Sequence, residues 1–124
     1  MYRVAGPKTL RLDKVGDFLE MNCSDLAYLR GALQLLDGNT TSVVIAFEFS
    51  CEPTGEGLFF EPDTATRLST IGNGKVSPSV IDCRGFIRCR MRVITATATA
   101  DSIGVARMGS FTEVTSFGFR GRDS

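Results

Sequence analysis

Three arginines alternate with apolar residues in the segment 87–93, and their spacing implies a chemical role more directly than any other feature of this chain. Successive side chains of a β-strand point to opposite faces of a sheet, so Arg88, Arg90 and Arg92 are expected to share one face. Such a row can pair with acids on neighbouring strands, such as Glu48, or contact a protein partner's carboxylates and backbone. Both hypotheses stay open on the sequence alone.

The residues needed for common catalytic chemistry are few. The chain has no histidine, which removes Ser-His-Asp, Cys-His and His-metal arrangements. Two carboxylate pairs remain, Glu48 with Glu52 and Glu56 with Glu61, but the chain has no tryptophan to serve as a sugar platform. We therefore expect solvated loop charges, no enzymatic activity and no cofactor.

The four cysteines lie at positions 23, 51, 83 and 89, without a CxxC pair. Cysteine is among the most buried residue types, so free and mostly buried thiols are expected rather than a zinc site. Calcium ligands could come from 13–17 or 37–40, but neither segment has EF-hand spacing. The segment 72–75 is typical of a hairpin turn rather than of a phosphate-binding loop. No metal site is predicted.

Length and charge limit the classes of partner. The chain has 124 residues, with 14 Lys+Arg against 14 Asp+Glu. A net charge of zero argues against direct nucleic-acid binding, which depends on phosphate neutralisation. No apolar run is long enough for a membrane helix, and the first residues lack the apolar region of a signal peptide, so we expect synthesis in a cytoplasm and no membrane partner.

Short alternating segments separated by turn residues dominate the chain. Strands are expected at 8–12, 17–22, 43–51, 66–71, 84–95 and 103–108, with 80–82 leading into the fifth. In 43–51 the alternation predicts that Val43, Ile45, Phe47, Phe49 and Cys51 face inward. The segment 26–36 has both helical and strand periodicity, and the strand is favoured because 43–51 is plainly a strand. This pattern predicts an all-β antiparallel β-sandwich, jelly-roll-like or Ig-like.

We expect one β-sandwich domain over 1–124, with a core at about 8–108 and a weakly patterned C-terminal arm at about 109–124. Aromatic residues are concentrated in one loop and in this arm, where they either fill the core or dock onto a neighbouring subunit. The candidate protein interface comprises the arginine row with these aromatic and arm residues: Arg88, Arg90, Arg92, Phe59, Phe60, Phe117, Phe119, Arg120 and Arg122.

Two segments carry a family resemblance that covers about residues 8–108. They are Val43-Val44-Ile45-Ala46-Phe47-Glu48-Phe49-Ser50 and Ile81-Asp82-Cys83-Arg84-Gly85-Phe86-Ile87-Arg88-Cys89-Arg90-Met91-Arg92-Val93. Together they resemble small β-sandwich virion proteins of tailed bacteriophages, which have a strand ending Phe-Glu-x-Ser and a later Gly-aromatic-x-x-Arg segment. The chain departs from the family after Ser50, where Cys51-Glu52-Pro53-Thr54-Gly55 replaces an Asp-Gly turn and a tryptophan.

The resemblance implies a non-enzymatic structural protein of the virion, made in the host cytoplasm. A capsid decoration, or cement, protein that binds and stabilises the assembled head is expected first. A tail, fibre or head-tail adaptor module, or a carbohydrate-binding module for host recognition, is the alternative. The implied partners are the major capsid protein or other virion proteins, and a homo-oligomer, either trimer or dimer, is expected.

Overall fold

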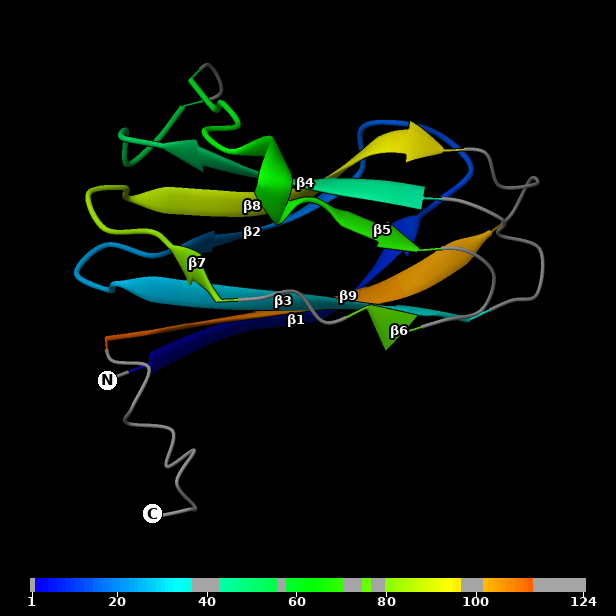
Figure 1. Ribbon diagram of the computed structural model, residues 1–124, viewed down its shortest axis with the longest axis horizontal. Helices are drawn as coiled ribbons and strands as arrows, with labels where there is room; N and C mark the ends of the chain where they lie inside the picture. Colours follow the sequence, from blue (N-terminus) through cyan, green and yellow to red (C-terminus); the bar gives the residue numbers. More distant parts are fainter. Residues whose placement is uncertain are drawn as a thin grey trace, which may run out of the picture.

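The computed structural model describes residues 2–36, 43–55, 58–70, 75–76, 80–96 and 102–112. In this part of the chain the elements are strands and one short 3-10 helix, stacked in two layers (Figure 1). They are β1 (Tyr2–Arg11), β2 (Phe18–Asn22), β3 (Tyr28–Leu35), β4 (Val43–Ser50), η1 (Thr64–Thr66), β5 (Leu68–Thr70), β6 (Lys75–Val76), β7 (Ile81–Asp82), β8 (Arg88–Ala96) and β9 (Ile103–Phe111). The prediction of an all-β antiparallel sandwich is confirmed.

The strand order is that of a jelly roll. One sheet has the order β1-β9-β3-β6, with β7 also paired to β3, and the other has the order β2-β8-β4-β5. The short strands β6 and β7 pair with opposite ends of β3 and occupy one strand position. With β6 and β7 counted as one position, the first strand pairs with the last (β1 with β9) and the second with the next to last (β2 with β8). In the same way β3 pairs with β6 and β7, and β4 pairs with β5. This pairing is that of a long antiparallel hairpin folded over on itself. An Ig-like sandwich distributes its strands differently.

The core lies between the two sheets and follows the alternation of the sequence. In β4 the inward residues Val43, Ile45, Phe47 and Phe49 are buried. In β8 the inward positions hold Cys89, Met91 and Val93, all fully buried. The layers approach closely at Gly31 of β3, where a Cβ atom would lie 2.8 Å from Met91 Sδ and 2.8 Å from Phe47 Cζ.

The ambiguous segment 26–36 is a strand, β3, as favoured. It pairs with β9 on one edge and with β6 and β7 on the other, so it is the central strand of its sheet. A helix there would leave the backbone groups of β9 unpaired, and buried backbone groups require partners.

The first and last strands were predicted too short. β1 begins at Tyr2 and β9 ends at Phe111, because residues 2–5 pair with 108–111. The register shifts between Ala5 and Lys8, at the cis peptide bond before Pro7. The candidate calcium ligands at 37–40 lie outside the described residues, as does most of the predicted hairpin turn at 72–75, whose last residue, Lys75, begins β6.

Candidate protein-binding surface

The three arginines of β8 lie on the outer face of the β2-β8-β4-β5 sheet, as the alternation predicts. Glu48 of β4 is directly opposite Arg90, and Glu20 of β2 is opposite Arg90 on the other side. Arg90 Nε lies 2.8 Å and Arg92 Nε 3.0 Å from Glu48 Oε1. Arg88 Nη1 lies 3.2 Å from Glu20 Oε2. The predicted pairing of this row with cross-strand acids is therefore confirmed.

The same arginines also hold the loop that follows β4. Arg88 Nε donates to the carbonyl oxygen of Glu52 at 2.9 Å, and its Nη2 donates to that of Gly55 at 2.7 Å. The Phe59 ring lies 4.1 Å from the guanidinium carbon of Arg90 and 4.8 Å from that of Arg88, within the range of cation–π attraction. The loop therefore covers Arg88 and Arg90.

Glu48 is only 8% exposed, although it points away from the core. Burial alone would raise the pKa of Glu48, but the hydrogen bonds and charges of Arg92 and Arg90 outweigh burial and hold this pKa below its ordinary value. Glu48 is thus a buried counter-ion shared by two arginines. It is not a carboxylate available for acid–base chemistry with Glu52, as one sequence alternative had it.

The loop aromatics differ in exposure. Phe59 is half-buried against the arginines, whereas Phe60 is 48% exposed. The Phe60 ring meets Phe86 edge-on at 5.6 Å, and Phe86 stacks on Phe49 at 4.7 Å between centroids. Four other predicted interface residues, Phe117, Phe119, Arg120 and Arg122, lie outside the described residues. An interface role for the whole predicted set stays a prediction.

The cysteines are free thiols, and three of the four are buried as expected. Cys51 is the exception: it was predicted to face inward, but β4 ends at Ser50 and the bend that follows exposes the thiol. A hydrogen bond with Cys83 acts to lower the pKa of Cys23, but the hydrogen bond with Cys89 and burial outweigh it and raise the pKa to about 12. The hydrogen bond with Cys23 and burial also raise the pKa of Cys83.

The second carboxylate pair considered from the sequence, Glu56 with Glu61, and the possible metal ligands form no site among the described residues. Glu61 is paired with Arg67 at 2.7 Å, and its predicted partner Glu56 lies outside the described residues. Within the ranges described above, no three His, Cys, Asp or Glu side chains are grouped so that they could hold a metal ion.

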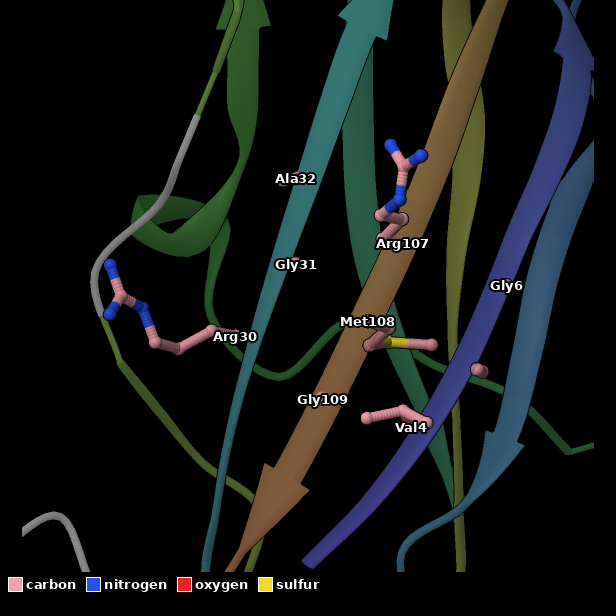
Figure 2. Close-up of a pocket in the computed structure, with 9 residues that line it drawn as sticks. Val4, Gly6, Arg30, Gly31, Ala32, Arg107, Met108 and Gly109 are labelled. Atoms are coloured by element: carbon pink, nitrogen blue, oxygen red, sulfur yellow. The ribbon is translucent and has the colours of Figure 1, made fainter. Parts of the chain in front are cut away.

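A shallow groove of about 470 Å³ lies over the other sheet, on the outer face of β1, β9 and β3 (Figure 2). Its lining is small or apolar apart from two arginines: Val4, Ala5, Gly6, Arg30, Gly31, Ala32, Arg107, Met108 and Gly109. The hollow exists because small residues occupy the centre of this face: Arg30 lies opposite Gly109, and Arg107 lies opposite Ala32. A Cβ atom at Gly109 would meet nothing nearer than the Arg3 carbonyl oxygen at 3.9 Å.

The rim of this groove combines cations with exposed apolar side chains. Figure 2 shows the Arg30 and Arg107 side chains extending from β3 and β9, with Val4 between β9 and β1, whereas Met108, also drawn there, is 2% exposed and belongs to the core. Tyr2 and Val4 are each 70% exposed. Among the described residues neither Arg30 nor Arg107 has a hydrogen bond, ion pair or ring contact through its side chain.

Sequence reasoning missed this groove. Arg30 and Arg107 are far apart in the chain and belong to no motif. The available signal was the alternation of β3 and β9, which places both arginines at outward positions beside glycine and alanine. The register that makes them neighbours comes only from the fold.

The comparisons with known proteins give weak similarities. No family model matches the chain, and no curated protein matches it. Among solved structures, the SPBc2 prophage-derived protein YomS has a TM-score of 0.46 at 12% identity, over 89% of this chain and 95% of that chain. The Tobacco streak virus coat protein dimer has a TM-score of 0.44 at 11% identity, over 90% of this chain and 87% of that chain. TM-scores this low establish neither a shared fold nor a shared function.

Across the part of the chain that the structure describes, no helix has the length and apolar character needed to span a membrane.

Proposed function

We propose that this chain is a non-enzymatic structural protein of a virion and that it acts as a capsid decoration protein. The observation that carries the proposal is the outer face of β1, β9 and β3. It presents a shallow groove, two arginines without partners among the described residues, and the exposed side chains of Tyr2 and Val4. Exposed apolar side chains beside unpaired arginines are typical of protein interfaces.

The resemblance to phage virion proteins supports the virion assignment. Its two segments form adjacent paired strands: Phe47 of β4 lies opposite Met91 of β8, and Ser50 lies opposite Arg88. The similarity thus follows one structural unit rather than two scattered stretches. The jelly-roll strand order adds a fold-level analogy, since capsid proteins are among the proteins built this way.

The proposed mechanism is thermodynamic linkage between binding of this protein and assembly of the shell. A protein that binds the assembled shell and not its free subunits stabilises the shell by mass action, by an amount that grows with the free concentration of the binder. This role requires a binding face and no chemistry, which agrees with a surface whose groups are guanidinium and small or apolar side chains.

Cosedimentation tests the proposal. Purified protein is mixed with heads and, separately, with tails from the phage or prophage whose genome carries the gene. The proposal expects saturable binding to mature heads and a raised temperature of head disruption. Binding to tails alone would move the function to a tail, fibre or adaptor module, and binding to neither would overturn the virion assignment.

A further inference from the structure

We infer that the groove over β1, β9 and β3 binds an extended acidic segment of a protein partner. The inference rests on the proposed function in that it names the chemistry of the partner at the same face. It is argued from three observations: two arginines that have no partner among the described residues, a groove lining without acids, and the shape of the floor.

The charge of the groove is uncompensated. Its nine lining residues include two arginines and no acid. Arg30 and Arg107 are diagonal neighbours on adjacent strands, since Arg30 is opposite Gly109 and Arg107 is two residues away on β9. A carboxylate from a partner would give each guanidinium the ion pair that the described residues do not supply.

Two acids of the described residues that lie near the ends of this face are already paired. Asp82, which is on the same face at the end of β3, binds Arg84, and this arginine lowers the pKa of Asp82. Asp13, near the other end, lies 2.7 Å from Arg11. Within the described ranges, arginines near the groove thus have counter-ions, whereas Arg30 and Arg107 have none.

The shape favours a polypeptide. Glycine and alanine keep the floor low along the strands, and Val4 supplies an apolar rim. Arg30 and Arg107 extend from different strands in different directions (Figure 2), so each would bind its own carboxylate. A segment with several acids separated by apolar residues fits these features. A nucleic acid fits them less well, because the chain has a net charge of zero.

A second copy bound through the same face is disfavoured. In a two-fold symmetric interface a surface patch meets itself, so the two unpaired arginines of each copy would meet without an intervening acid. The groove therefore points to a different protein as its occupant, whatever oligomer forms through other faces.

The first test is an NMR titration of the full-length ¹⁵N-labelled chain with the blocked hexapeptide Val-Glu-Val-Glu-Val-Glu. Its matched controls are the peptide with Gln in place of Glu, and oligo-dT. We expect the acidic peptide alone to shift the amide signals of 30–32 and 107–109. Equal shifts by both peptides, shifts elsewhere, or a stronger response of the groove to oligo-dT would overturn the inference. Groove shifts that depend only on protein concentration would instead indicate a second copy.

The second test uses variants. Arg30→Gln with Arg107→Gln should weaken binding of the acidic peptide about tenfold, since each partly exposed pair contributes up to ~1 kcal/mol. Gly109→Leu should fill the groove and weaken binding without a change of charge. The matched control, Lys14→Gln with Arg67→Gln, removes the same charge at two positions outside the groove lining and should leave binding within about twofold of the original. An equal loss in the control would reduce the effect to net charge and overturn the inference.

Cosedimentation with heads separates this inference from the proposed function. If the unmodified protein and the Arg30→Gln, Arg107→Gln variant bind heads equally well, the function stands and the groove inference is wrong. If neither binds heads while the acidic peptide still shifts the groove signals, the groove inference stands and the decoration role is wrong.

Discussion

The outer faces of the two sheets use arginine in opposite ways. On β8 the arginines contact Glu48, Glu20 and Phe59, and the loop after β4 covers Arg88 and Arg90. On β3 and β9, Arg30 and Arg107 point to solvent beside a groove and have no partner among the described residues. We call the outer face of the β2-β8-β4-β5 sheet the closed face, because its arginines are covered by other parts of the chain, and the outer face of β1, β9 and β3 the open face.

Register explains the difference. Arg90 has a glutamate opposite it on each neighbouring strand, whereas Arg30 is opposite Gly109 and Arg107 is opposite Ala32. An arginine with a cross-strand acid contributes to stability, and an arginine facing small residues has no such pair. The position of an arginine on an outer face therefore does not reveal its role until its cross-strand neighbour is known.

The largest expected effect on stability distinguishes a core-facing glycine from an outward-facing glycine of the β1-β9-β3-β6 sheet. Gly31→Val should destabilise the fold by about 3 kcal/mol, because even a Cβ atom there would lie 2.8 Å from Phe47 Cζ. Gly109→Val should change stability by less than ~1 kcal/mol, since this outward position has open space and strands favour valine. Urea denaturation measures both variants, and equal losses would contradict the assignment of Gly109 to the outer face.

Loss of the shared counter-ion tests the closed face. Glu48→Gln should lower the free energy of unfolding by about 2 kcal/mol, because it leaves two half-buried arginines without their carboxylate. This value lies between the ~0.5 kcal/mol of an exposed ion pair and the ~3 kcal/mol or more of a fully buried one. Guanidinium chloride screens charges, so urea is the appropriate denaturant. A loss below ~0.5 kcal/mol would mean that the closed face behaves like an ordinary solvated surface.

Substitution of Phe59, whose ring covers Arg88 and Arg90, should have a smaller effect on stability. Phe59→Leu keeps an apolar side chain but removes two cation–π contacts, with an expected cost of about 1 kcal/mol. Tyr2→Leu, on the open face, should cost almost nothing because Tyr2 is 70% exposed. Thermal unfolding of the two variants checks the pair, and a larger loss for Tyr2→Leu would reverse the assignment of the two faces.

The smallest effect is a change in pH dependence. The pKa of Glu48 is lower in the folded state than its ordinary value of 4.5, so its contribution is complete above about pH 4.5 and is lost as the pH falls through the folded-state pKa. Glu48→Gln should therefore flatten the acid limb of the stability profile. Arg30→Gln with Arg107→Gln should leave that limb unchanged, and a matching flattening would show that the open face carries the titrating interaction.

The fold class could be predicted from the sequence because the alternation of apolar and polar residues is visible within each short segment. The inward residues Val43, Ile45, Phe47 and Phe49 were identified by spacing alone, and all are buried. The role of 26–36 could not be fixed in this way, because its spacing fits a helix and a strand. Pairing on both edges by β9, β6 and β7 decides it, and these partners come from later in the chain.

The surface was less predictable than the core. Pairing of the arginine row with Glu48 was anticipated because both segments were recognisable strands. The groove was not, because it depends on two residues brought together by the β3–β9 register. Cys51 was misplaced for a related reason: alternation continues to it, but the strand ends one residue earlier.

The most direct test of the central claim compares two matched pairs of arginines by urea denaturation: Arg90→Gln with Arg92→Gln, and Arg30→Gln with Arg107→Gln. Both variants remove the same charge from an outer sheet face. The first should lose about 2 kcal/mol of unfolding free energy, because it leaves Glu48 buried without its partners, and the second should stay within ~0.5 kcal/mol of the unmodified chain. Equal losses, or a larger loss for the Arg30 and Arg107 variant, would contradict the division into a closed face and an open one.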